Sequence, residues 1–165
     1  MKTSSIILMT ALCSAGATSL VFSPVASTAE VTKASSEKQA ATAVTFRKSL
    51  LQLVRSNMGA LGAMAKGKIP MDAEVIAVNA SRIEFLGAMM HDYFALDTTA
   101  FSVETDAKDS VWKNHDDFTS KINDLVTAAS DLQVLVANKQ ESDFREGIGA
   151  LGASCKACHD EYKKD

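Results

Sequence analysis

The chain has 165 residues, a formal net charge of −3 and three cysteines. Its length suits one domain with one hydrophobic core. Its mild acidity argues against a nucleic-acid partner, because no basic stripe is present that could neutralise phosphates.

Residues 1–29 have the pattern of a secretory signal peptide. Lys2 precedes an apolar run, and Ser27 and Ala29 form a small-residue cleavage site, so we expect cleavage after Ala29 and loss of Cys13. The alternative is a membrane anchor, but the apolar stretches are short for a spanning helix. Removal takes away one lysine and no acid, which leaves residues 30–165 with a net charge of −4. We therefore expect an exported, periplasmic domain at 30–165 with no membrane attachment after cleavage.

The first predicted helix covers about residues 36–66. Its apolar positions form two neighbouring stripes that together span about 180°, which is wider than one core face needs. One stripe consists of Val44, Arg47, Leu51, Val54, Met58 and Leu61, and the other of Phe46, Leu50, Leu53, Asn57 and Met64. Gly67 and Pro70 should end this helix.

Three further helices are predicted. The second covers about residues 72–94 with Asp72 as its N-cap. A connection of about fifteen residues follows, long enough to suggest a functional loop. The third helix, about 110–137, has apolar residues at 4-3-4-3 spacing, and the fourth begins near Ser142 as N-cap. The sequence therefore predicts an all-α, antiparallel up-down four-helix bundle.

The fourth helix ends with the motif CKACH, which contains Cys155, Cys158 and His159. On a helix the two cysteines share one face, and His159 lies one turn after Cys155. Two thiols at this spacing can add to the two vinyl groups of a porphyrin, and the adjacent imidazole can ligate its iron. C-x-x-C-H is the attachment pattern of c-type haem, and histidine is a standard axial ligand. The motif predicts one covalent haem c, with His159 as the metal ligand.

Other interpretations of this motif have less support. A zinc site needs four ligands, and only His91 and His115 remain to complete one. A thioredoxin-like dithiol belongs beside a βαβ unit, for which no pattern is present. A disulfide within CxxC closes too small a loop to stabilise a domain, and a chance match remains possible. The small residues between 147 and 154 would allow close approach of either a macrocycle or a neighbouring helix.

A haem motif at the end of the last helix of a four-helix bundle resembles the cytochrome c′ family, the class II c-type cytochromes. The resemblance covers nearly all of the chain after the predicted signal peptide. Three stretches carry it: AVTFRKSLLQLVRSNMGALGAMAKGKIP (43–70), TDAKDSVW (105–112) and GASCKACHDEYKKD (152–165). The resemblance implies that Cys155 and Cys158 form thioether bonds and that His159 is the proximal ligand.

The resemblance also implies further haem contacts. Arg47 matches a family arginine close to the haem propionates, and a guanidinium can bind carboxylates bidentately. Lys48 stands where the family often has glutamine, with a polar contact to the haem. Lys163 matches a basic position near the proximal histidine, and Thr105 and Asp106 fall in the loop that approaches the haem edge.

Leu51 matches the family residue that points at the sixth coordination site. High-spin members have an apolar residue there and low-spin electron carriers have methionine, so the resemblance implies a five-coordinate, high-spin haem that binds small uncharged gases such as NO and CO. Met58 lies two turns further along the same stripe, about 10.5 Å by helix rise. We expect Met58 and Met64 to lie in the core, His115 to be a packing residue and His91 to be solvated.

The outer stripe around Phe46, Leu50 and Leu53 is available for a second subunit. Family members are commonly homodimers through their first two helices, so we predict a homodimer; the alternative is a monomer whose long loop covers this stripe. The predicted function is gas binding by a non-enzymatic periplasmic haem protein, in NO tolerance or transport. The alternative is a single-electron carrier with a redox partner protein. Peroxidase activity has little support, because no distal His and Arg pair is evident.

Overall fold

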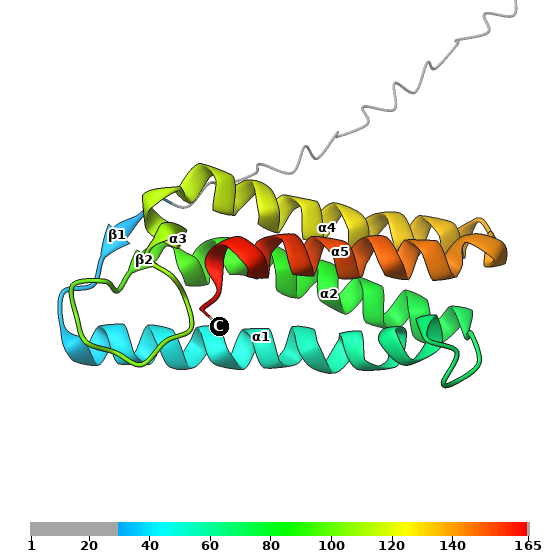
Figure 1. The fold of residues 1–165 in the computed structure, drawn as a ribbon, viewed down its shortest axis with the longest axis horizontal. Coiled ribbons are helices and arrows are strands. Elements are labelled where there is room, and N and C mark those ends of the chain that lie inside the picture. Colours follow the sequence, from blue (N-terminus) through cyan, green and yellow to red (C-terminus); the bar gives the residue numbers. More distant parts are fainter. Residues whose placement is uncertain (1–29, 165) are drawn as a thin grey trace, which may run out of the picture.

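The computed structural model describes residues 30–164, and the predicted signal peptide lies outside these residues. The elements in chain order are β1 (Thr32–Lys33), α1 (Glu37–Ala65), α2 (Ala73–Phe94), β2 (Leu96–Asp97), α3 (Ser110–Lys113), α4 (His115–Ala137), the 3-10 turn η1 (Glu141–Asp143) and α5 (Phe144–Tyr162). Helices α1, α2, α4 and α5 form an antiparallel bundle, which confirms the predicted fold class (Figure 1). None of the described helices is long and apolar enough to cross a membrane.

Helix α1 directs a single stripe into the core, and this stripe runs between the two that the sequence suggested. Its buried residues are Ala40, Val44, Arg47, Leu50, Val54, Asn57, Leu61 and Met64. Leu50 is therefore a core residue, whereas the sequence placed it on the outer stripe; Leu51 stays 38% exposed. The helix ends at Ala65, and two residues later the positive φ of 67° at Gly67 lets the chain turn back so that the amide of Lys68 reaches the carbonyl of Ala63.

The other helix boundaries show which terminal signals were informative. Asp72 caps α2 as predicted, because its side chain accepts a hydrogen bond of 3.0 Å from the amide of Val75. The predicted helix at 110–137 is interrupted at Asn114, which has non-helical backbone angles and separates α3 from α4. The predicted N-cap Ser142 is wrong, because it lies inside η1 and α5 begins two residues later.

Two very short strands connect the start of the chain to the segment after α2. β1 and β2 pair in parallel, with Thr32 opposite Leu96 and Lys33 opposite Asp97. The amide of Thr32 donates to the carbonyl of Ala95 at 2.9 Å, and that of Ala34 to Asp97 at 2.8 Å. The residues that precede α1 are thereby held against the segment that follows α2.

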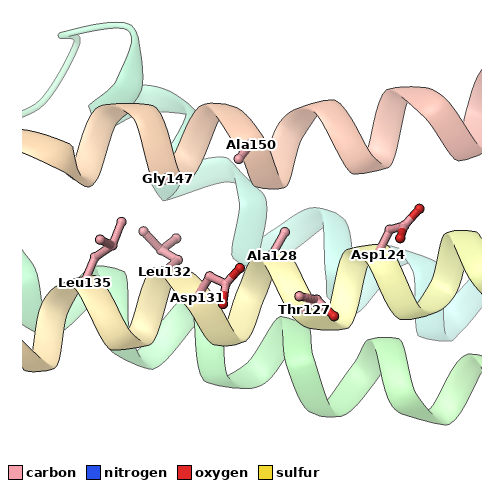
Figure 2. Close-up of a pocket in the computed structure, with 8 residues that line it drawn as sticks. All are labelled: Asp124, Thr127, Ala128, Asp131, Leu132, Leu135, Gly147 and Ala150. Atoms are coloured by element: carbon pink, nitrogen blue, oxygen red, sulfur yellow. The ribbon is translucent and has the colours of Figure 1, made fainter.

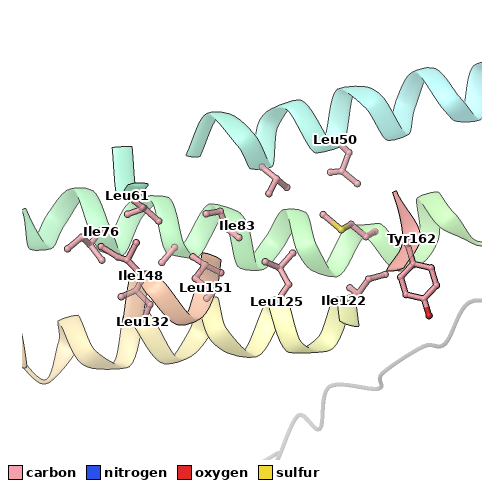
Figure 3. Close-up of a cluster of buried hydrophobic side chains, with 14 of the residues drawn as sticks. Leu50, Leu61, Ile76, Ile83, Ile122, Leu125, Leu132, Ile148, Leu151 and Tyr162 are labelled. Carbon is pink, nitrogen blue, oxygen red and sulfur yellow. The ribbon is translucent and has the colours of Figure 1, made fainter. Parts of the chain in front are cut away.

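The core fills the space between α2, α4 and α5, with α1 covering one side (Figure 3). Leu61, Ile83, Leu132 and Leu151 are completely buried, and burial of each such side chain contributes about 1.5–3 kcal/mol. Helix α5 packs mainly on α4 and has few contacts with α1. The two helices that carry the predicted haem residues are thus the most loosely packed neighbours in the bundle.

Candidate functional site

The motif CKACH lies in the last two turns of α5. Cys155 and Cys158 are half-buried free cysteines that pack against the core, and His159 is exposed. Burial raises the pKa of the Cys155 thiol. Burial, with a smaller contribution from the neighbouring Cys155, raises the pKa of Cys158 to about 11. Both thiols are therefore protonated at neutral pH in the folded chain.

The loop between β2 and α3 holds the end of α5. Lys108 donates from its Nζ to the carbonyl of Asp160 at 3.1 Å and from its amide to the carbonyl of Tyr162 at 2.9 Å. Ser110 donates from Oγ to the carbonyl of Glu161 at 3.4 Å. These donors satisfy carbonyls that a helix terminus leaves without partners, so the turn that carries His159 is fixed by the loop.

Three predicted site residues lie at this junction of the loop with the end of α5. The carbonyl of Thr105 accepts from the Nζ of Lys164 at 3.1 Å, and the carbonyl of Asp106 accepts from the amide of Lys164 at 2.7 Å. Lys163 donates from its amide to the carbonyl of His159 at 3.1 Å. The structure therefore brings Thr105 and Asp106 to Lys164, five residues after the histidine, and Lys163 to the backbone of the histidine itself. The side chains of Thr105, Asp106 and Lys163 are exposed or half-buried.

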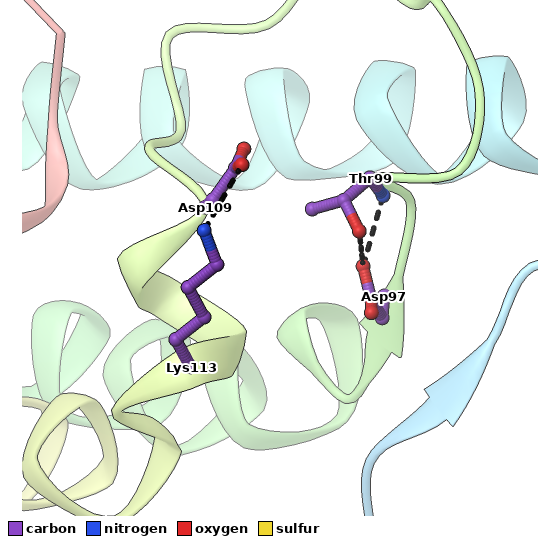
Figure 4. Close-up of polar contacts among 4 residues, drawn as sticks. All are labelled: Asp97, Thr99, Asp109 and Lys113. Atoms are coloured by element: carbon purple, nitrogen blue, oxygen red, sulfur yellow. Dashed lines mark hydrogen bonds and ion pairs between the residues drawn. The ribbon is translucent and has the colours of Figure 1, made fainter.

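Local side-chain contacts order both ends of this loop (Figure 4). Asp97 accepts from the amide of Thr99 at 2.8 Å and from its hydroxyl at 2.7 Å, which forms a turn directly after β2. Asp109 pairs with Lys113 at 3.5 Å across one turn of α3, although this exposed pair contributes little stability. The long connection predicted from the sequence thus has defined structure.

The predicted residues of α1 have different environments. Arg47 is 3% exposed, and its guanidinium points at the end of α2. Burial lowers the pKa of Arg47 to about 10, against an opposing effect of Asp97. Lys48 is exposed, and Leu51 lies beside the buried stripe with its side chain partly in solvent.

Sequence reasoning missed a polar contact beneath the motif. Tyr162 is 3% exposed, and its hydroxyl donates a short hydrogen bond to Oδ2 of Asp117 on α4. Burial and this hydrogen bond raise the pKa of Tyr162. Its ring packs edge-on against Phe118, with centroids 5.1 Å apart. The only signal in the sequence for this contact was a tyrosine four residues after Cys158 on a core-facing helix. The position of its partner could not be predicted, because Asp117 belongs to another helix.

The remaining histidines have other contacts. His91 Nε2 lies 3.1 Å from Oδ1 of Asn123, and His115 Nδ1 lies 3.3 Å from the carbonyl of Val111. Within residues 30–164 no group of three or more His, Cys, Asp or Glu side chains is arranged to hold a metal ion. The donors at the end of α5 are two thiols and one exposed imidazole, which is the set that a covalent haem requires and one donor short of a structural zinc site.

The glycines of α5 have separate surroundings. A Cβ at Gly147 would lie 2.8 Å from Leu135 Cδ1 and 2.9 Å from Leu132 Cδ1, so this glycine permits close packing on α4. A Cβ at Gly149 or Gly152 would meet nothing within 4 Å. A groove of about 300 Å³ lies beside Gly147 and Ala150, bordered by Asp124 and Asp131, two turns before the motif (Figure 2).

Comparison with known proteins agrees with this arrangement. The family profile described as Cytochrome C′ matches residues 42–163. Cytochrome c′ of Rubrivivax gelatinosus is 30% identical over 128 residues, covering 74% of this chain and 94% of the relative. Cytochrome c-554 of Cereibacter sphaeroides is 32% identical over 120 residues, covering 72% of this chain and 90% of the relative.

Solved structures give the same result. Cytochrome c prime from Shewanella frigidimarina superposes with a TM-score of 0.69 at 32% identity, covering 76% of this chain and 97% of that one. The nitric oxide complex of a leucine-to-alanine variant of cytochrome c prime from Alcaligenes xylosoxidans superposes with a TM-score of 0.66 at 28% identity, covering 76% and 96%. With a bundle that ends in CKACH and a family match over most of its length, the chain belongs to the cytochrome c′ family of c-type haem proteins.

Proposed function

We propose that this chain is a periplasmic haem protein that binds small uncharged gases, NO and CO, at an open coordination position. The observation that carries the proposal is Leu51, which is apolar, has no atom that can ligate iron, and lies partly exposed beside the buried stripe of α1. The nearest methionines in sequence do not replace it, since Met64 is buried and Met58 packs against the core. The nitric oxide complex of the Alcaligenes relative supports the same ligand class.

In this proposal Cys155 and Cys158 attach the haem, and His159 is its axial ligand. Each thiol adds across one vinyl group, with the sulfur bonding one vinyl carbon and a proton the other. The bound haem would supply an iron atom that coordinates the gas. The half-buried position of both cysteines and the exposure of His159 support this assignment.

Intact-mass measurement on protein purified from the periplasm tests attachment and export together. The expected mass is that of residues 30–165 plus one haem, retained under denaturing conditions. Cys155→Ser and Cys158→Ser should each leave one thioether, and the double variant should release the haem on denaturation. A wild-type protein that loses its haem on denaturation would contradict covalent attachment.

Carbon monoxide binding by Leu51 variants tests the function. Leu51→Ala removes the apolar wall and should speed CO association, whereas Leu51→Met supplies a sulfur ligand and should weaken CO binding and give a low-spin spectrum. Val134→Ala, a change at an exposed apolar residue of α4 outside the proposed dimer surface, is the control. If the wild-type ferrous protein does not bind CO, the alternative of a single-electron carrier with a redox partner replaces this proposal.

We also propose a homodimer through α1 and α2. Large apolar side chains are exposed on both helices: Phe46, Leu53, Val78, Phe85 and Met89. Phe85 is 71% exposed, and apolar side chains that gather into one exposed patch are typical of protein interfaces. Sedimentation analysis should show a dimer that Phe85→Lys converts to a monomer, with Val134→Lys on α4 as control; a monomeric wild-type protein would contradict the proposal.

A further inference from the structure

Arg47 is the only charged residue among the buried residues of the described chain, 30–164. It lies on α1 one turn before Leu51, about 6 Å along the helix axis. Leaving a buried charge without partners would cost several kcal/mol, so its contacts define what it does.

The guanidinium bonds to the end of α2 and the segment after it. Nε donates to the carbonyl of Tyr93 at 2.8 Å, Nη1 donates to the hydroxyl of Thr98 at 3.2 Å, and Nη2 donates to the carbonyl of Leu96. The last carbonyls of a helix lack partners within the helix and carry its negative dipole end. A cation at this place therefore satisfies the Tyr93 carbonyl in the last turn of α2 and is itself stabilised.

Two aromatic rings complete the environment of the guanidinium. Its Cζ lies 5.1 Å from the ring centroid of Phe94 and 5.0 Å from that of Trp112. The Nε1 of Trp112 donates to the carbonyl of Phe94 at 2.9 Å, which fixes the indole in this position. A planar guanidinium can stack on aromatic rings in a way that an ammonium group does not.

Backbone hydrogen bonds from the residues before α1 also hold the segment that Arg47 binds. Residues Thr32 and Ala34 donate backbone hydrogen bonds to Ala95 and Asp97, on either side of the Leu96 carbonyl that Arg47 binds. These N-terminal residues precede the family match, which starts at residue 42. Arg47 thus connects α1 to a junction that the N-terminal segment of this chain reinforces.

We propose that Arg47 is a positioning residue that fixes the turn of α1 carrying Leu51 against the end of α2. The family resemblance implies a contact with haem propionates, but three of the five N–H groups of this guanidinium already donate within the protein, and the side chain is 3% exposed. The consequence for gas binding rests on the proposed function: when these contacts are lost, the turn with Leu51 becomes mobile and gas reaches the iron faster.

The test compares Arg47→Lys, Thr98→Val, the double variant and the control Arg55→Lys in the haem-loaded protein. Arg55 is an exposed arginine two turns further along α1. The readouts are the CO association rate after flash photolysis and hydrogen exchange of the α1 amides around Leu51. Arg47→Lys keeps the charge but replaces the planar guanidinium fork by a single nitrogen, which cannot reach all three acceptors at once. Thr98→Val removes one acceptor and preserves side-chain shape.

We expect Arg47→Lys to raise the CO association rate and the amide exchange near Leu51 by about fivefold, and Thr98→Val by about twofold. The double variant should resemble Arg47→Lys, because both changes remove the same contact. If Arg47→Lys and Thr98→Val both have the CO association and amide exchange rates of the wild type, the proposal is overturned. That result would fit a role in which the positive charge pairs with the haem propionates, because both variants keep this charge. If no variant binds CO, the proposed function fails, while the exchange data still decide whether Arg47 positions this turn.

Discussion

The hydrogen bond between Tyr162 and Asp117 leads to a stability prediction at the end of the haem-bearing helix. Tyr162→Phe removes the donor and leaves the exposed carboxylate of Asp117 to water, so no buried group loses its partner. A hydrogen bond to a charged group contributes about 1.5–3 kcal/mol. We expect Tyr162→Phe to lower the free energy of unfolding at neutral pH by about 2 kcal/mol.

The same contact makes stability depend on alkaline pH. Burial and the hydrogen bond raise the pKa of Tyr162 above its ordinary value of 10.0. The resulting stabilisation is fully present below pH 10.0 and is lost as the pH rises toward the folded-state pKa, because the unfolded chain releases the phenol proton first. Between pH 10.0 and the folded-state pKa, the wild-type protein should lose up to about 1.4 kcal/mol per pH unit relative to Tyr162→Phe.

Urea unfolding of the haem-loaded proteins, followed by circular dichroism from neutral to alkaline pH, measures both effects. Tyr93→Phe is the matched control, because the chain has two tyrosines and the Tyr93 hydroxyl makes no hydrogen bond to the described residues. It should change the free energy of unfolding by less than about 0.5 kcal/mol. Parallel pH profiles for wild type and Tyr162→Phe would refute the assigned cause.

Two further predictions concern the backbone. Gly149→Ala should stabilise the protein by about 0.5–1 kcal/mol through helix propensity. Gly147→Ala should destabilise it by about 1 kcal/mol, because its Cβ crowds two leucines of α4. Urea unfolding measures both variants, and a Gly147→Ala protein more stable than Gly149→Ala would contradict this packing. Lys139 has a positive φ of 55° after α4, so Lys139→Gly should raise the free energy of unfolding by about 0.5–1 kcal/mol. A loss of stability in Lys139→Gly would show that the lysine side chain has contacts that outweigh the backbone strain.

The fold could be predicted because each long helix has its own apolar period. The period did not reveal the break at Asn114, since Val111 and Phe118 keep helical spacing across it. It also placed Leu50 and Leu51 only approximately, because two adjacent stripes of α1 gave the same signal and the true core stripe runs between them. Hydrophobic periodicity identifies the side of a helix that packs in the core, but not which residues lie at the centre of that side.

The motif at the end of α5 was evident from spacing alone, whereas its supporting contacts were not. Two of the three acceptors of Arg47 are backbone carbonyls and the third is the Thr98 hydroxyl, all more than forty residues away, and their position depends on how α2 ends. A charged residue within an apolar stripe predicted a contact of some kind, and the family resemblance suggested a carboxylate partner. The parallel pair β1–β2 is two residues long on each side, too short for any alternation to indicate it.

The most direct test of the central claim is the absorption spectrum of the purified ferrous protein before and after addition of CO. An open position beside Leu51 predicts a broad high-spin Soret band that shifts when CO is added. A sharp low-spin spectrum that CO does not change would show an internal sixth ligand, and would contradict the proposed gas-binding function.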